Sequence, residues 1–230
     1  MKKEAKPPAS SGRVELVSRL LSSLLFVPVI VLMCLVKDEY ISIFCLFSFA
    51  TYAAILKEIC ARSINGKYLL RSVAAVVCFM GIFAFVYCRK VLGVSGCIFL
   101  ISVSSFTDIG AYCFGKVIGG PKLCPRISPK KTWAGFLGGI IMANMACYSL
   151  DGLFFSVSNT NAAFSCIYNL ATIQYVIIFS IFGDLLESFF KRKISVKDMG
   201  NIFPGHGGVL DRLDSLIVAS IALALMVILF

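Results

Sequence analysis

Long apolar runs separated by short polar segments dominate this chain. Each run approaches the roughly 20 residues that a helix needs to cross a bilayer. We predict about seven transmembrane helices, with a range of six to nine because short or broken helices could lie within 92–115 or 152–182. The predicted spans are 20–36, 41–56, 69–88, 91–106 (with a continuation to 114), 134–150, 162–182 and 216–230.

The composition supports a membrane protein rather than a soluble domain. Hydrophobic residues make up 59% of the chain and the mean hydropathy is +0.90, whereas soluble domains have roughly 45–50% apolar residues. The expected fold is all-α, a polytopic integral membrane helical bundle whose cytoplasmic loops form the active site. We predict that residues 1–13 form a disordered cytoplasmic tail and that residues 14–106 form the N-terminal transmembrane helices. Residues 107–230 are predicted to form the catalytic membrane region.

Positive charges are distributed unequally between the two sides of this bundle. With an inside N-terminus, only Lys37, Arg89 and Lys90 of the 22 basic residues fall on the outer side. The positive-inside rule therefore places the large loops in the cytoplasm of a multi-pass protein of the inner (plasma) membrane. The net charge of +10 points to anionic lipid headgroups or a phosphate-bearing substrate, and not to nucleic acid.

The ten cysteines are scattered and form no CxxC pair. We interpret them as small apolar packing residues. A zinc site is not expected, because His206 is the only histidine and no metal-ligand spacing is present.

The segment 183–215 concentrates acidic residues next to apolar spans. Asp211 and Asp214 are three apart, so on a helix their carboxylates share a face, and Asp184 precedes Ser188 by four residues. Clustered carboxylates suit a hard cation such as Mg²⁺. The alternative is salt bridging, which we expect for Glu187 at helical spacing from Lys191. The segment holds five of the twelve acids: Asp184, Glu187, Asp198, Asp211 and Asp214.

The same segment carries basic residues and a glycine turn. The run 191–193 could serve only as a topology signal or contact lipid headgroups, or it could join Lys197 in binding phosphoryl oxygens. Gly207 and Gly208 allow backbone amides to approach an anion at the start of the last helix. His206 could donate to a phosphate, shuttle a proton or cap the turn.

A second polar cluster occupies 107–133. Asp108 lies in an otherwise apolar run, where an acid indicates function. Hydroxyl and basic side chains follow at Ser128, Lys130, Lys131 and Thr132, although the lysines could equally anchor a helix at the headgroups. The glycines of 135–139 are spaced for close helix packing. The two clusters would lie on the same cytoplasmic face, with acidic residues to bind a metal and basic residues to bind phosphate. This combination is typical of phosphoryl or nucleotidyl transfer.

Two motifs in these clusters resemble a known family. The longer one reads Ser188-Phe-Phe-Lys191-Arg192, then Lys197-Asp198-Met-Gly200, then Phe203-Pro-Gly-His206-Gly207-Gly208-Val-Leu-Asp211-Arg212-Leu-Asp214. It resembles the signature, here at 188–214, of the phosphatidate cytidylyltransferase (CDP-diacylglycerol synthase) family. Asp108-Ile-Gly-Ala-Tyr112 and Ile127-Ser-Pro-Lys-Lys-Thr-Trp133 are similar to a second region of that family. The resemblance covers 104–216.

The resemblance implies that CTP and phosphatidic acid react to CDP-diacylglycerol and pyrophosphate in phospholipid biosynthesis, with Mg²⁺ as cofactor. A second metal or a monovalent cation, and a homodimer, remain open. The implied metal residues are Asp184, Asp211, Asp214 and Ser188. The implied catalytic residues are Asp184, Asp211, Lys191, Asp198 and His206. The implied substrate-binding residues are Lys130, Lys131, Ser128, Arg192, Lys197, Gly207, Gly208, Arg212 and Asp108.

Two other functions are compatible with the residues. A CTP-dependent lipid alcohol kinase would use the same polyanion-binding clusters with a hydroxyl acceptor. An ion-coupled membrane transporter would use Asp108 and Asp184 as intramembrane carboxylates. The second is disfavoured because the acids cluster with bases in a loop-rich stretch rather than at mid-membrane.

Overall fold

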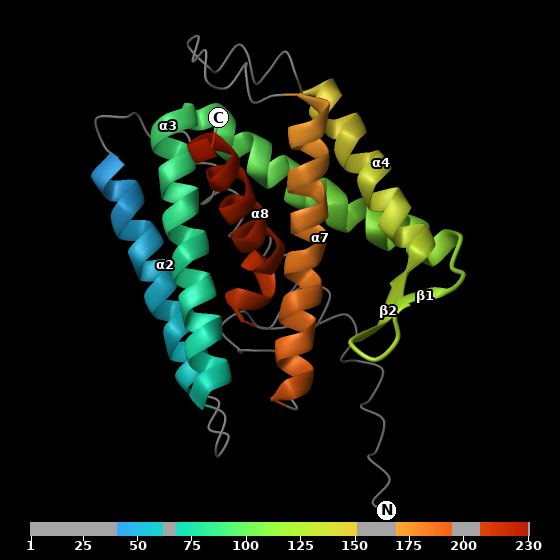
Figure 1. Ribbon diagram of the computed structural model, residues 1–230, viewed down its shortest axis with the longest axis horizontal. Helices are drawn as coiled ribbons and strands as arrows, with labels where there is room; N and C mark the ends of the chain where they lie inside the picture. Colours follow the sequence, from blue (N-terminus) through green and yellow to red (C-terminus); the bar gives the residue numbers. More distant parts are fainter. Residues whose placement is uncertain (1–40, 62–67, 151–168, 195–207, 230) are drawn as a thin grey trace, which may run out of the picture.

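The computed structural model describes residues 41–61, 68–150, 169–194 and 208–229 (Figure 1). The described part is mostly helical, as predicted, and contains one small antiparallel hairpin that the all-α prediction did not include. The predicted tail and the predicted span 20–36 lie outside the described residues. The helices are α2 (Ile41–Ala61), α3 (Tyr68–Val117), α4 (Trp133–Ser149), α7 (Leu170–Lys193) and α8 (Leu210–Leu229); the strands are β1 (Lys122–Cys124) and β2 (Ser128–Thr132).

Among the described helices, three are long and apolar enough to cross a membrane. They are Ser72–Val117 within α3, Leu170–Lys193 and Leu210–Leu229. The helices α2 and α4 match the predicted spans 41–56 and 134–150. The described residues thus support a helical membrane protein. They contain five helices, so the predicted seven spans are not confirmed.

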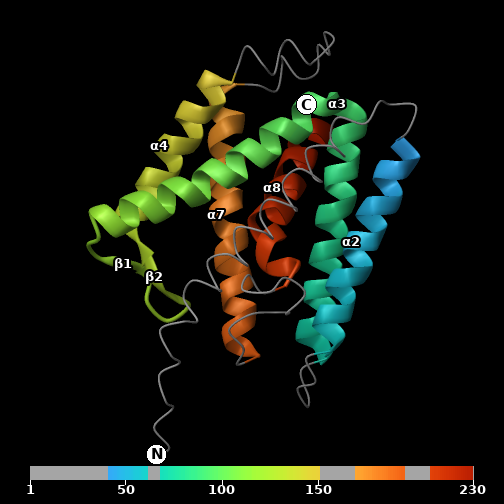
Figure 2. The same ribbon diagram turned by 180° about the vertical axis from the view of Figure 1, so that it is seen from behind.

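The helix α3 joins two of the predicted spans. We predicted 69–88 and 91–106 as separate helices with Arg89 and Lys90 in the connection, but helix continues through both residues to a kink at Gly93. Gly93 has φ 70° and ψ −157°, a conformation that is essentially restricted to glycine because it has no Cβ. Figures 1 and 2 show the first arm of α3 beside α2 and the second arm turning across the bundle toward the hairpin. The two arms of α3 are therefore joined at a single residue, Gly93, and not by a loop.

The second arm of α3 packs closely against α4 through glycines. A Cβ at Gly110 would lie 2.5 Å from the carbonyl oxygen of Gly138, and one at Gly135 would lie 2.6 Å from that of Ala111. Gly138 itself faces the side chain of Phe114. The packing role predicted for the glycines of 135–139 is confirmed, since no larger residue would allow the two backbones to approach this closely.

The helix α8 occupies the centre of the bundle, between α7 and the first arm of α3 (Figures 1 and 2). Ala219 and Leu223 of α8 are almost fully buried in the main core with Val176 and Ile177 of α7. On α3, Gly81 packs directly against Ile217 of α8. The start of α8 and the end of α7 lie at the same end of the bundle, which brings the two predicted acidic segments together.

Candidate active site

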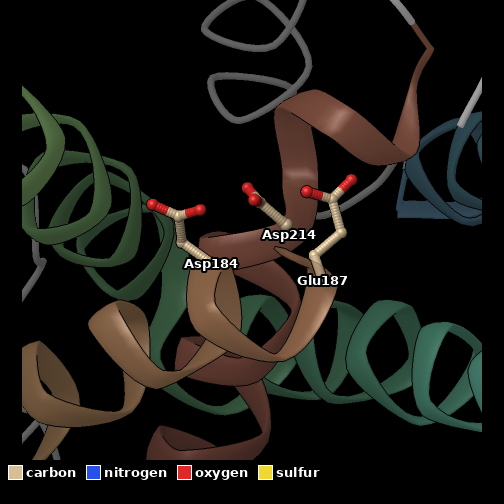
Figure 3. A group of neighbouring side chains, drawn as sticks. All are labelled: Asp184, Glu187 and Asp214. Atoms are coloured by element: carbon tan, nitrogen blue, oxygen red, sulfur yellow. The ribbon is translucent and has the colours of Figure 1, made fainter. Parts of the chain in front are cut away.

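Three carboxylates from α7 and α8 form a compact group. One side-chain oxygen from each of Asp184, Glu187 and Asp214 lies within 4.8 Å of the other two. We call this group the acid row, because Figure 3 shows Asp214 of α8 between Asp184 and Glu187 of α7. Asp184 and Glu187 are three residues apart and therefore share one face of α7.

The acid row depends on a close approach of α7 to α8 at Gly183. A Cβ at this position would lie 2.7 Å from the backbone oxygen of Asp214 and 3.1 Å from the Cα of Ser215. Real Cβ atoms do not approach backbone atoms this closely, so the packing needs glycine. The residue directly before Asp184 therefore sets how near the two helices bring their carboxylates.

Gly183→Ala is expected to lower thermal stability by about 1–3 kcal/mol, because the added methyl group overpacks the helix contact. Activity should fall as well, since the helices can relieve the clash only by separating Asp184 from Asp214. Thermal unfolding of the detergent-solubilised protein measures the first effect and a turnover assay the second. Phe182→Leu, at an exposed neighbouring position, is the control. A fully stable and active Gly183→Ala protein would contradict this account.

Lys191 links the acid row to the first turn of α8. Its Nζ lies 2.6 Å from Oε2 of Glu187 and 2.8 Å from Oδ1 of Asp211. The predicted salt bridge between Glu187 and Lys191 is confirmed. The other oxygen of Asp211 accepts the backbone N–H of Gly208 at 2.6 Å. Asp211 therefore holds the start of α8 and is not one of the three members of the acid row.

The hairpin supplies a second lysine. Lys131 on β2 places its Nζ 2.6 Å from Oδ2 of Asp184. The hairpin is attached at two further points: Arg192 of α7 donates from Nε to the carbonyl oxygen of Ile127 at 3.3 Å, and Thr132 caps α4 by accepting the N–H of Gly135 at 3.1 Å. Lys131 thus approaches the acid row from the side opposite to Lys191.

The second arm of α3 contributes Asp108. Its Oδ2 accepts a hydrogen bond of 3.4 Å from the hydroxyl of Ser215, whose oxygen is also 2.7 Å from that of Ser104. These contacts tie α3 to α8 next to Asp214. Counting Asp108 and Asp211 with the acid row, five carboxylates of the described residues gather around the ammonium groups of Lys131 and Lys191.

Glu187 has an unsatisfied oxygen. Its Oε1 is buried and has no hydrogen-bond partner within the described ranges; the hydroxyls of Thr107 and Ser180 share this condition. A buried polar atom without a partner is rare in proteins and costs free energy. An orphaned carboxylate oxygen beside two other carboxylates fits a divalent cation, which takes several oxygen ligands and offsets their mutual repulsion.

Within the described ranges, two small pockets border the acid row. The first, the apolar pocket, lies between α7, α8 and the first arm of α3 and is lined by residues that include Glu187 and Asp214. The second, the mixed pocket, lies between α7, α4, the hairpin and the second arm of α3. It is lined by Asp184, Lys131 and Thr107 together with apolar residues that include Leu123, Phe136 and Ile181.

Most of the predicted site residues that the structure describes lie together. Asp108, Lys131, Asp184, Lys191, Asp211 and Asp214 meet around the acid row. Other predicted residues lie on or next to the same elements: Ser188 and Arg192 on α7, Ser128 and Lys130 on β2, and Gly208 and Arg212 at the start of α8. Lys197, Asp198, His206 and Gly207 lie outside the described residues.

Two residues of this site, Glu187 and Thr107, were not predicted from the sequence. Glu187 was interpreted as a salt-bridge partner only, although its spacing of three residues from Asp184 already placed both on one helix face. Thr107, which lines the mixed pocket, was only part of the motif next to Asp108 and carried no signal of its own.

Comparison with known proteins agrees with the motifs. A sequence model of the cytidylyltransferase family matches residues 9–230. Curated relatives named phosphatidate cytidylyltransferase include one from Staphylococcus haemolyticus, 41% identical over 153 residues (66% of this chain, 55% of the relative), and one from Rickettsia bellii, 46% identical over 114 residues (49% of each). The chain spans about half the length of these relatives. It belongs to the cytidylyltransferase family.

Proposed function

We propose that this chain transfers the cytidylyl group of CTP to phosphatidic acid, releasing pyrophosphate and forming CDP-diacylglycerol for phospholipid biosynthesis. The observation that carries the proposal is the acid row between Lys131 and Lys191, at one end of membrane-length helices. Family membership and the names of the relatives support it.

The proposed reaction is an in-line displacement at the α-phosphorus of CTP. An oxygen of the phosphatidate phosphate forms the new bond to this phosphorus, while the bond to the pyrophosphate oxygen breaks. The nucleophile is already anionic, so little base catalysis is needed. The main task is to hold two polyanions together and to neutralise their charge. Lys131 and Lys191 would supply positive charge from opposite sides of the acid row.

The acid row would hold Mg²⁺ through Asp184, Glu187 and Asp214, with Asp211 and Ser188 close by. The bound ion would neutralise charge on the phosphates and on the departing pyrophosphate. The support is the orphaned Oε1 of Glu187 and the gathering of carboxylate oxygens. In this arrangement Lys131 balances Asp184, whereas Lys191 balances Glu187 and Asp211. Both ammonium groups lie at the ends of the row and would turn toward phosphoryl oxygens.

The proposed setting is the inner membrane, with about seven spans and the acid row at the cytoplasmic side. The charge asymmetry of the sequence supports this orientation. Such a position lets the diacylglycerol chains stay in lipid while the phosphate meets CTP at the surface. A homodimer is compatible with this setting.

Labelled CTP tests the proposal. Membranes that contain the protein, given phosphatidic acid and CTP labelled at the α-phosphorus, should yield labelled lipid, because the cytidylyl group carries that phosphorus. Label that enters lipid only from the γ-position would instead show a lipid alcohol kinase. Ion flux in liposomes without any turnover of CTP would show a transporter. Chelation of divalent cations should stop the labelling, and added Mg²⁺ should restore it.

A further inference from the structure

Ser215 of α8 directs both of its hydrogen-bond donors to carboxylates of the candidate site. Its backbone N–H donates to Oδ1 of Asp214 at 2.8 Å, and its hydroxyl donates to Oδ2 of Asp108 at 3.4 Å. Asp214 is the middle member of the acid row (Figure 3), whereas Asp108 belongs to the second arm of α3. One buried residue thus contacts carboxylates from two different helices.

The hydroxyl of Ser215 does not serve its own helix. A serine within a helix can satisfy its hydroxyl locally by donating to the carbonyl oxygen four residues earlier. Ser220, later on α8, does this with the carbonyl oxygen of Leu216 at 2.7 Å. Ser215 makes no such bond within the described ranges, and its hydroxyl reaches across the helix interface to α3 instead.

Ser104 of α3 fixes the direction of this hydroxyl. Its oxygen lies 2.7 Å from that of Ser215, and both residues are buried. A hydroxyl has one proton to donate, and an ionised carboxylate can only accept. The proton of Ser215 is therefore committed to Asp108, so Ser104 donates to Ser215. The result is a directed chain of two hydroxyls that ends on one oxygen of Asp108.

Asp108 depends on this chain for its orientation. Its side chain is exposed, and Ser215 is its only hydrogen-bond or ion-pair partner among the described residues. Lys131 lines the mixed pocket together with Asp108, but it is paired with Asp184. Without the hydroxyl of Ser215, Asp108 would be free to take other rotamers and to turn its carboxylate away from this lysine.

We propose that Ser215, oriented by Ser104, is a positioning residue of the site. Its hydroxyl holds the Asp108 carboxylate beside Lys131 and Asp184, at the end of the acid row away from Lys191. The held carboxylate keeps the Lys131 ammonium at this end of the row while the lysine turns toward phosphoryl oxygens. The inference rests on the proposed function and goes further, because it gives roles to two serines outside the motifs quoted above.

Ser215→Ala tests the proposal, because it removes the hydroxyl and leaves the backbone N–H on Asp214. The kcat/KM for transfer of label from α-labelled CTP to lipid should fall by about 3- to 10-fold, the effect of losing one hydrogen bond. Ser104→Ala should cause a smaller loss. Ser220→Ala is the matched control on α8 and should retain full activity, since its hydroxyl bonds to the backbone.

A double-mutant cycle separates positioning from packing. In an Asp108→Ala protein, Ser215→Ala should cause no further loss of turnover, because the group that it positions is gone. Equal losses in both backgrounds would overturn the proposal and mean that Ser215 only packs α8 against α3. Ser215→Cys keeps the shape of the side chain but has a weak S–H donor. It should behave like alanine, and full activity would also overturn the proposal.

Thermal unfolding of the four proteins of this cycle tests the contact without turnover. The two substitutions together should lower the unfolding temperature by less than the sum of the single changes, because they remove the same contact. Strictly additive changes would show that the two side chains do not interact, whichever reaction the protein catalyses. Failure of the proposed function would be seen separately, as absent labelling of lipid by the wild-type protein.

Discussion

Replacing Asp214 with asparagine is expected to lower the proposed cytidylyl transfer by roughly 10²–10³-fold, the loss typical of removing one preorganised electrostatic contact from an active site. Asp214 is the middle member of the acid row, and asparagine keeps its shape while removing its charge. Cation binding should weaken with the loss of this charge. The measurement is incorporation of α-labelled CTP into lipid, over a range of Mg²⁺ concentrations.

The control for this variant is Ser220→Ala. Ser220 is a buried residue later on α8 whose hydroxyl donates to the backbone oxygen of Leu216 at 2.7 Å. It should insert into the membrane at the same level as Asp214→Asn and retain activity. Near-normal turnover in Asp214→Asn would remove this carboxylate from the proposed metal site, and a shared loss in both proteins would point to packing of α8.

Lys191→Ala is expected to have the second large effect, again about a hundredfold or more in turnover. Its ammonium group lies between Glu187 and Asp211, so truncation removes an ion-pair partner from both carboxylates and positive charge from the phosphates. Leaving a buried carboxylate unpaired also destabilises the fold, by about 3–5 kcal/mol. Thermal unfolding should therefore be measured alongside turnover, and Lys191→Arg should recover part of both.

Lys193→Ala gives the matched comparison on the same helix. Lys193 is exposed and its Nζ lies 5.4 Å from the ring centroid of Phe189, away from the contacts that Lys191 makes. Its replacement should change turnover by no more than about twofold, since exposed charges contribute little. Equal losses in the two variants would mean that the total positive charge matters and the position of each lysine does not.

The helical membrane fold could be predicted from apolar run length alone, but the connections could not. The pair Arg89 and Lys90 looked like a loop between two spans, because charges usually mark the ends of membrane helices. In the structure helix continues through both residues and the direction changes at Gly93. Glycine is compatible with helix, strand and turn, so its sequence context gives no direct sign that it takes a φ of 70°.

The acids of the site could be predicted as a set, but not their pairing. Spacing along one helix relates Asp184 to Glu187, and Asp211 to Asp214. Which of them meet across helices depends on the rotation of α7 against α8, and that rotation is set by packing at Gly183. The result is that Glu187 joins the acid row while Asp211 caps the start of α8. The hairpin also escaped prediction, because its strands are too short to show a clear alternation of polar and apolar residues.

The kink of α3 has a consequence for how the protein enters the membrane during synthesis. At 1.5 Å per residue, a straight helix of this length would measure about 75 Å, more than twice the hydrocarbon thickness of a bilayer. In the proposed orientation, both arms would therefore have to enter the membrane together, and Arg89 and Lys90, which lie just before the kink, would have to cross it. Charged residues at the bilayer centre cost about 2.5–3.5 kcal/mol each on insertion scales. In the folded protein Arg89 is only 3% exposed, so completed packing shelters one of these charges after insertion.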